Sequence, residues 1–350
     1  MKSYLSYLFS LAFFFLASCT ESYQLPNLGN QTTIVITGLI TNEPGPYYVT
    51  VWENVSNIST GESIRRGIND ARVIITDSKG NVDELCSFYS VPLESEVLED
   101  WPFYREYYRI PDGKGYYIKF ITSSKNDTRE GKYFTTSTKG QPGQTYTLKV
   151  EYAGREYIAT DYMCFGTVID SISVEPIGRF INDKPDGSDG FLVPCIYFAE
   201  PQDETNYYLF KYFSFWQTDG KIYVEHINNM SLMKMSDDWL ISVVSDRFMP
   251  PYVNKYKISD GDSERKYYSG TDMGFYHSGC GWVYGGAVDM YCITEAVYRY
   301  YNELSRQYYQ DGGAFSPSPA SPPTNISGGA QGCFSAASVS QYVLDLRNNQ

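Results

Sequence analysis

The most sharply defined chemistry in this sequence lies near its beginning, at Leu16-Ala17-Ser18-Cys19. One apolar residue, two small residues and a cysteine form a lipobox, in which the thiol is the nucleophile that accepts diacylglycerol. The apolar run before Cys19 has the length of a signal-peptide core and is too short to span a bilayer. We therefore predict a signal peptide over residues 1–18, cleaved after Leu16-Ala17-Ser18, and a lipid-modified Cys19. Two or three acyl chains, palmitate among them, give stable membrane anchoring.

A second group of reactive residues, His277, Ser278 and Cys280, stands in HSGCGWVYGG and comes nearest to a nucleophile beside its base. Neighbours along a strand point to opposite faces, however, whereas a catalytic triad needs side chains that converge in space. The metalloprotease spacing HExxH and the nucleophile elbow GxSxG are both absent from the sequence. Among 41 acidic residues, the spacing singles out no carboxylate pair for glycoside hydrolysis. We expect no catalytic residues and no enzyme activity.

Six cysteines remain after Cys19, and none of them belongs to a CxxC motif. Because only His226 and His277 could join them, we expect no metal site and no cofactor. An exported chain can pair its cysteines, but an even count alone does not fix the connectivity. Cys280 and Cys292 flank a segment rich in glycine and aromatic residues and are the best candidates for a local disulfide. Free buried cysteines are the competing interpretation.

The charge balance is acidic, with a formal net charge of -13 from 28 basic and 41 acidic residues. No basic run is longer than Arg65-Arg66. Because binding to phosphate groups needs clustered cations, nucleic acid is not an expected partner. Anionic lipid is not expected to attract the chain either, which leaves the acyl anchor to hold it on the membrane.

Aromatic residues make up 17% of the chain, and much of this content is expected from a β-rich composition. Tyrosine suits half-buried strands, but it also supplies rigid area at binding surfaces. Part of this aromatic content falls in the acidic, proline-interrupted stretch 90–112, which we predict to be a long inserted loop. The candidate contact surface combines aromatic residues from two segments: Trp101, Phe103, Tyr104, Tyr107, Tyr108, Trp282 and Tyr284. For Trp282, packing in the core is the competing interpretation.

Residues 19–31 show no periodicity and are predicted to form a lipidated tether. From 32 to 161, runs rich in β-branched and aromatic residues alternate with Pro/Gly turns, which is typical of a β-sandwich. Within TYTLKVEY, residues 145–152, apolar and polar side chains alternate and indicate a half-buried strand. A hairpin turn at Ala153-Gly154 is expected to join it to REYIATDYM.

Residues 162–350 are predicted to form a second β-rich domain, with a hairpin at Asp219-Gly220. Over residues 294–310 the apolar spacing changes to three and four, which predicts one amphipathic helix with Thr294 as its cap. The Pro/Ser-rich FSPSPASPPTNISGG is expected to be an ordered connection to a returning strand, CFSAASVSQYVLDL. The predicted fold is mainly β. An N-terminal immunoglobulin-like or carboxypeptidase-regulatory-like β-sandwich precedes a β-rich domain with one amphipathic helix.

Several motifs follow one another in a characteristic order: ITGLITNEPGPYYVTV, ARVIITDSKGN, GQPGQTYTLKVEYAGREYIAT, IDSISV and FSPSPASPPTNISGGAQGCFSAAS. Together with the lipobox they resemble a large family of Bacteroidota lipoproteins known only as a domain of unknown function. The similarity covers nearly the whole mature chain. Genes of that family usually lie beside TonB-dependent, SusC-like receptors. The resemblance implies an outer-membrane accessory lipoprotein that works with such a transporter, and it supplies no catalytic residues.

We therefore expect a non-enzymatic lipoprotein that binds a TonB-dependent transporter or captures its ligand, whose identity the sequence leaves open. Thr20 stands in place of the aspartate that retains some lipoproteins at the inner membrane, so passage to the outer membrane is expected. Glu21 is the one acidic residue directly after Cys19, and the sequence does not decide between the periplasmic and the cell-surface face. A fimbrillin-like adhesin subunit is the alternative, and a surface glycan or peptide hydrolase is a more distant one.

Overall fold

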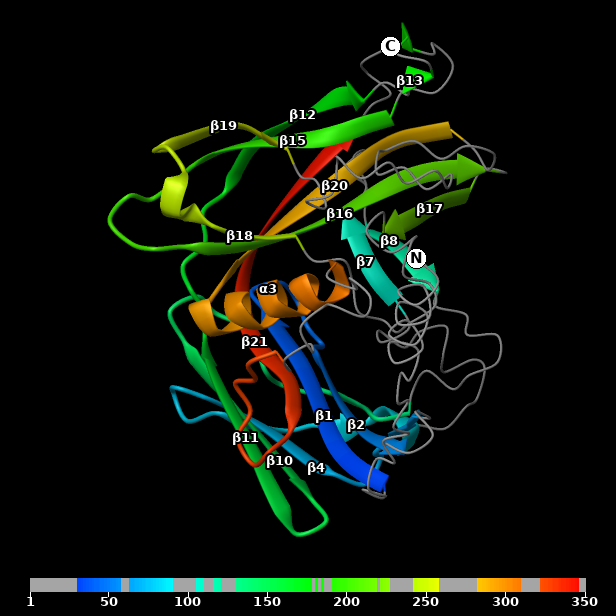
Figure 1. The fold of residues 1–350 in the computed structure, drawn as a ribbon, viewed down its shortest axis with the longest axis vertical. Helices are drawn as coiled ribbons and strands as arrows, with labels where there is room; N and C mark the ends of the chain where they lie inside the picture. Colours follow the sequence, from blue (N-terminus) through cyan, green and yellow to red (C-terminus); the bar gives the residue numbers. More distant parts are fainter. Residues whose placement is uncertain are drawn as a thin grey trace, which may run out of the picture. The chain divides into compact units, whose positions relative to one another are not determined.

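The computed structural model describes residues 30–57, 63–90, 105–109, 116–120, 130–177, 180–181, 184–185, 191–218, 221–226, 242–257, 282–309 and 322–345. The described residues are mainly β-strand, with a single α-helix among them (Figure 1). The chain divides into two compact units, residues 1–32 with 54–64 and residues 33–53 with 65–350, and the side-chain contacts below belong to the second unit. None of the helices in these ranges is long and apolar enough to cross a membrane.

The first β-sandwich packs two sheets around one core. One sheet includes, in order, β1 (Asn30–Thr41), β2 (Tyr48–Asn57), β9 (Lys132–Phe134) and β6 (Cys86–Ser87), with β3 (Ser63–Gly67) beside β2. The other sheet contains, in order, β11 (Arg155–Tyr162), β10 (Thr145–Tyr152), β4 (Arg72–Asp77) and β5 (Val82–Glu84). Its core consists of buried side chains from both sheets, among them Ile36, Val49, Val73, Leu148 and Val150. The predicted N-terminal β-sandwich is therefore present.

The β10–β11 hairpin has the geometry that the sequence predicts. The strands are antiparallel, with Tyr152 opposite Arg155. The turn residues Ala153 and Gly154 both have positive φ, 49° and 72°, which matches the twist of the flanking strands. Along β10, the predicted alternation of buried and partly exposed side chains is confirmed.

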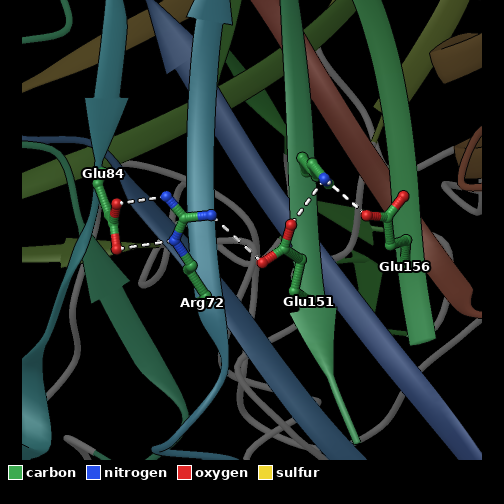
Figure 2. A network of polar contacts seen from close by, with 5 residues as sticks. Arg72, Glu84, Glu151 and Glu156 are labelled. Carbon is green, nitrogen blue, oxygen red and sulfur yellow. Dashed lines mark hydrogen bonds and ion pairs between the residues drawn. The ribbon is translucent and has the colours of Figure 1, made fainter. Parts of the chain in front are cut away.

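The outer face of the same sheet carries a charged network that crosses its four strands (Figure 2). Arg72 of β4 lies between Glu84 of β5, at 2.9 Å, and Glu151 of β10, at 3.3 Å. Lys149 of β10 contacts Glu151 at 2.6 Å and Glu156 of β11 at 2.7 Å. Hydrogen bonds from Arg72 to Glu84 and Glu151 raise the pKa of the Arg72 guanidinium. Because the side chains are largely exposed, the network stabilises the fold little and marks the solvent-facing side of the sheet.

The second half of the chain forms another sandwich around its own core. A three-stranded sheet contains, in order, β12 (Ile169–Ile177), β15 (Phe191–Ala199) and β19 (Tyr252–Lys257). It packs on strands β16 (Tyr207–Thr218), β20 (Trp282–Ile293) and β21 (Gln331–Asp345). The sheet of these strands also contains β17 (Lys221–His226) and β18 (Ser242–Ser245), both paired to β16. The core between the sheets includes Ile172, Ile196, Phe198, Phe210 and Val288. Thr218 lies opposite Lys221, so β16 and β17 pair as the predicted hairpin requires, while its turn residues Asp219 and Gly220 lie outside the described residues.

Short elements complete the described chain. They are the 3-10 helices η1 (Phe88–Ser90) and η4 (Asp246–Phe248), the pair β7 (Arg105–Arg109) and β8 (Tyr116–Phe120), and the pair β13 (Phe180–Ile181) and β14 (Lys184–Pro185). β7 corrects the expectation of a loop throughout 90–112. Its sequence, REYYR, is rich in tyrosine and pairs with the similar YYIKF of β8, because aromatic residues favour strands.

The single α-helix, α3 (Glu295–Tyr309), confirms the helix predicted over 294–310. Its apolar side packs on the face of the β16–β20–β21 sheet that lies opposite the second core, and Val297 is fully buried there. The Thr294 carbonyl accepts the Tyr298 amide, as expected at a helix start. The Thr294 hydroxyl donates to Asp161 at 2.6 Å, and acceptance of a helix amide by the same oxygen stays a prediction.

β21 belongs to both sandwiches. Its first half, Gln331 to Ala337, pairs in parallel with β1, and its second half pairs antiparallel with β20 (red, blue and orange in Figure 1). Phe334 lies in the first core, whereas Tyr342 packs against the second. The predicted returning strand is confirmed, and it joins one continuous ten-stranded sheet. The boundary between residues 161 and 162 stays a prediction, and β21 contributes to the cores on both sides of it.

Two asparagines bind backbone groups of β21 at positions where it has no neighbouring strand on that edge, because β1 and β20 each pair with only part of its length. Asn325 donates from Nδ2 to the Phe334 carbonyl at 2.7 Å and accepts the Phe334 amide on Oδ1 at 3.0 Å. On the other edge, Asn42 accepts the Val339 amide at 2.6 Å, directly after β1 ends. Buried backbone groups need such partners. Both asparagines belong to motifs that carry the family resemblance, TNEPGPY and PPTNISGG, so these motifs have an architectural role.

β21 also approaches β1 so closely that one position requires glycine. Gly332 has a φ of 104°, and a Cβ added there would lie 2.0 Å from the Ile36 carbonyl oxygen. Gly329, in the preceding turn, has a φ of 82°, but an added Cβ would meet nothing within 4 Å. Positive φ favours glycine at both positions. At Gly329 it forms a turn, and at Gly332 the absence of a Cβ also lets β21 lie close to β1.

Candidate functional site

Most of the residues predicted to carry function lie outside the described ranges: Leu16, Ala17, Ser18, Cys19, Trp101, Phe103 and Tyr104. Tyr107 and Tyr108 are on β7, where they pair with β8. Trp282 begins β20, and Tyr284 falls at an irregularity in the pairing of β16 with β20. The lipidation site and the aromatic contact surface therefore stay predictions.

A row of polar side chains crosses the sheet on the face that carries α3. Lys211 of β16 lies opposite Asp289 of β20, and Asp289 lies opposite Gln341 of β21. The Gln341 amide donates to Asp289 Oδ1 at 2.8 Å, and the Tyr291 hydroxyl donates to Oδ2 at 3.4 Å. Residues two apart on a strand share a face, so strand register alone gathers these groups.

Burial controls the protonation of this row. Asp289 is 5% exposed, and desolvation raises its pKa to about 7. The negative charge of Glu43, which follows β1, acts in the same direction, while the Gln341 hydrogen bond and the Lys211 charge oppose it. Desolvation also raises the pKa of Glu43, again opposed by Lys211. Two carboxyls with raised pKa values, Asp289 in the row and Glu43 beside it, are therefore near Lys211.

A carboxyl with a raised pKa beside a lysine is the kind of group that serves as a general acid or base. Catalysis also requires contact with a substrate, and Asp289 is enclosed between neighbouring strands with its oxygens held by Gln341 and Tyr291. Lys211 is directed over the Tyr291 ring, with Nζ 4.7 Å from the ring centroid. The row can hold a proton and fix strand register, and we interpret it as part of the fold.

A second buried carboxyl joins the two sandwiches. Asp161, near the end of β11, accepts the Thr294 hydroxyl at 2.6 Å and the Ala336 amide at 2.7 Å. Desolvation raises the pKa of Asp161 to about 6, although both hydrogen bonds favour its ionised form and lower the pKa. The Asp161 carboxylate therefore accepts one hydrogen bond from the residue before α3 and one from the backbone of β21.

The described cysteines include one close pair. Cys164 follows β11 and packs against the second core, which contains Cys292 of β20. The two thiols are free, and each shifts the pKa of the other. The disulfide predicted between Cys280 and Cys292 stays untested, because Cys280 lies outside the described residues.

Another carboxylate, that of Asp83, is held by several hydrogen-bond donors. Asp83 accepts five hydrogen bonds at 2.7–3.0 Å, from the amides of Thr136, Ser137 and Thr138 and the hydroxyls of Thr136 and Thr138. Burial opposes ionisation of Asp83, but these donors outweigh it and lower its pKa. Within the described part of the chain, no three His, Cys, Asp or Glu side chains gather as a metal site requires.

Sequence reasoning missed the polar row and the Asp161 contact. A signal existed for the row, because Lys211 and Asp289 are single charges inside the apolar runs YYLFKYFSF and AVDMYCI. Charged residues are rarely buried unless they are paired, so each run indicated a partner on a neighbouring strand. The identity of that partner depends on register across strands that are distant in sequence.

A comparison with curated proteins finds no match for this chain. A family match covers residues 20–342, which is nearly the whole chain after the predicted lipidation site. The matched residues include the two motifs whose asparagines bind β21, the polar row, and Cys164 with Cys292. The chain belongs to the family described as "domain of unknown function (DUF4249)".

Proposed function

We propose that this chain is an outer-membrane lipoprotein that acts, without catalysing a reaction, as an accessory or ligand-binding partner of a TonB-dependent transporter. The observation that carries the proposal is the lipobox at Leu16-Ala17-Ser18-Cys19, placed shortly before β1. The order of motifs, which resembles Bacteroidota lipoproteins encoded beside SusC-like receptors, supports the choice of partner.

The non-enzymatic part of the proposal is supported by how the perturbed carboxyls are used. Asp161 is engaged by Thr294 and Ala336, and Asp289 by Gln341 and Tyr291. Both side chains are 5% exposed. Carboxyls that serve the fold in this way are poorly placed to meet a glycan or a peptide.

Lipidation is tested by growing cells with an alkyne analogue of palmitate and labelling the purified chain. We expect the label on the unmodified chain and on Cys86→Ser, an exposed cysteine that serves as the matched control. Cys19→Ser should lose the label and leave the membrane fraction. Retention of the label by Cys19→Ser would contradict the anchor, whatever the partner.

The partner is tested with a photo-crosslinking amino acid placed at Tyr107, Tyr108, Trp282 or Tyr284. We expect ultraviolet light to join these positions to an outer-membrane receptor that mass spectrometry identifies. Arg72, on the exposed charged face in Figure 2, is the control position and should give no such product. Equal crosslinking at Arg72 and at the aromatic positions would contradict a contact surface built from these aromatics.

The adhesin alternative makes a different prediction about β1. Fimbrillin-like assembly removes the first strand, but Ile36 and Ile40 of β1 are buried in the first core and β1 pairs with β21. Removal of β1 therefore requires a strand from another copy to replace it. The mass of the cell-bound chain decides between the two. An N-terminus at Cys19 favours the accessory protein, and a chain cut after β1 that forms ladders on a gel favours the adhesin.

A further inference from the structure

We propose that Cys164 and Cys292 are a dithiol pair that closes into a disulfide when the folded protein meets a disulfide donor. This inference does not depend on the proposed function, because it concerns the folded chain and any disulfide-containing oxidant. The pair lies where the connection after β11 passes the end of β20, immediately before α3 begins.

The two cysteines lie in the same part of the second core. Cys292 is 2% exposed and lies in the second core, and the half-buried Cys164 packs against that core. Each thiol shifts the pKa of the other. The Cys292 thiol also reaches Asn206 Oδ1 at 3.9 Å, and the Cys164 thiol reaches the Tyr162 carbonyl at 3.9 Å. We therefore expect the bond to form by movement of these two side chains within the core.

The backbone on both sides of the pair is held in place. Asp161, three residues before Cys164, is bonded to Thr294, two residues after Cys292. Gly166, two residues after Cys164, is so close that an added Cβ would lie 3.5 Å from Cys292 Cβ and 2.4 Å from Ser338 Oγ. Asn206 is in turn fixed by a 3.1 Å hydrogen bond to the buried Glu200. The two cysteines are thus held together by contacts that do not involve sulfur.

The two thiols are not equivalent, and this sets the order of the reaction. The interaction with Cys292 lowers the pKa of the Cys164 thiol, whereas the interaction with Cys164 and burial raise the pKa of the Cys292 thiol. Cys164 is also the more exposed of the two. Cys164 is therefore the thiolate that attacks the donor, since the thiolate is the nucleophile and access limits the reaction.

The exchange balances in two steps. The Cys164 thiolate attacks one sulfur of the donor R–S–S–R, which breaks the donor bond, forms a mixed disulfide on Cys164 and releases RS⁻. The Cys292 thiol then loses its proton to RS⁻ and attacks Cys164 Sγ, which forms the Cys164–Cys292 bond and releases a second RS⁻ that takes a proton from water. Overall, two protein thiols are oxidised and one donor disulfide is reduced to two thiols.

The test uses the full mature chain in detergent, treated with glutathione disulfide in the folded state. Remaining thiols are alkylated, and the chain is digested without reduction for mass spectrometry. We expect a Cys164 peptide joined to a Cys292 peptide, lighter than the two separate peptides by two hydrogen atoms and released by dithiothreitol. The oxidised chain should also melt several degrees higher than the reduced chain, because the bond closes a loop of about 130 residues.

Three variants make the result specific. In Cys292→Ser, glutathione should remain attached to Cys164, because the resolving thiol is missing. In Cys164→Ser, Cys292 should stay reduced, because it is buried. Cys86→Ser, which changes an exposed cysteine elsewhere, should form the linked peptide as the unmodified chain does.

Several outcomes would overturn the proposal. A Cys280–Cys292 peptide would show that the pair predicted from sequence forms instead. Failure of Cys164 to react while the exposed Cys86 becomes glutathionylated would show that the pair is inert. If either serine variant does not fold, the peptide map of the unmodified chain decides on its own.

Discussion

The Thr294 hydroxyl donates a 2.6 Å hydrogen bond to the Asp161 carboxylate and so links the start of α3 to the end of β11. The same carboxylate accepts the Ala336 amide of β21 at 2.7 Å. Asp161 lies at the inner edge of the first sandwich, while Thr294 begins the helix that covers one face of the second. One buried side chain therefore connects three elements that are far apart in sequence.

Replacing Asp161 with alanine leaves the buried Ala336 amide without its acceptor and removes the partner of the Thr294 hydroxyl. An unsatisfied buried group costs about 1–3 kcal/mol, so we expect the free energy of unfolding to fall by about 2–4 kcal/mol. Urea denaturation followed by tryptophan fluorescence measures the change. The exposed Asp203→Ala is the control, expected to change stability by about 0.5 kcal/mol or less. Equal effects of the two substitutions would show that the Asp161 contact is not stabilising.

Asn42 and Asn325, which bind the backbone of β21, should contribute separately to the free energy of unfolding. Asn325→Ala removes two hydrogen bonds to Phe334 and is expected to cost about 2 kcal/mol of unfolding free energy. Asn42→Ala removes a more exposed pair of bonds to Val339 and should cost about 1 kcal/mol. The double variant should give the sum within about 0.5 kcal/mol, because the two sites share no partner. A strongly non-additive double variant would mean that β21 shifts as a unit when either asparagine is lost.

Much of the local structure follows from the sequence alone. Alternation in TYTLKVEY fixed the inward face of β10, and Ala153-Gly154 fixed its turn, because both depend on neighbouring residues. The change of period at residues 294–310 located α3 within one residue at each end. The hydrogen bond from the Thr294 hydroxyl to Asp161 could not be predicted, because Asp161 is distant in sequence.

Two glycines of the PPTNISGGAQG segment provide a matched test of close packing. Gly329→Ala places a side chain at positive φ in open space and should cost about 1–2 kcal/mol. Gly332→Ala adds a clash with the Ile36 carbonyl and should cost about 3 kcal/mol or more. Thermal and urea denaturation of both variants measure the difference. Equal losses would indicate that β1 and β21 can separate without penalty.

Because the pKa of Asp289 is raised in the folded chain, the free energy of unfolding should decrease as pH rises. Its pKa is about 7 in the folded chain and 3.8 ordinarily, so the folded state keeps a proton that the unfolded state has lost. The stability from this group is complete below about pH 4 and is lost as pH rises to about 7, by at most about 1.4 kcal/mol per pH unit. Asp289→Asn is neutral throughout and should flatten this part of the profile of unfolding free energy.

The pH profile needs two comparisons. Asp203→Asn should keep the slope of the unmodified chain, since Asp203 is exposed. Asp161, with a pKa of about 6, contributes in the same direction, so Asp289→Asn should reduce the slope without removing it. A slope that does not change in Asp289→Asn would show that the carboxyl ionises normally in the folded chain.

The long-range arrangement could not be predicted from local patterns. CFSAASVSQYVLDL indicates a strand, but nothing in it specifies parallel pairing with β1 near the other end of the chain. Lys211, Asp289 and Gln341 meet only because β16, β20 and β21 are in register. Each residue looks like an ordinary charge or amide until the neighbouring strand is known.

The shared strand β21 sets a condition on when the chain can fold. A ribosome or an export channel delivers the chain from its N-terminus, so β1 and β2 emerge long before residues 331–337. Until those residues arrive, β1 lacks its parallel neighbour and the first core lacks Phe334 and Ala336. The topology therefore keeps even the N-terminal sandwich incomplete until nearly the whole chain has been delivered.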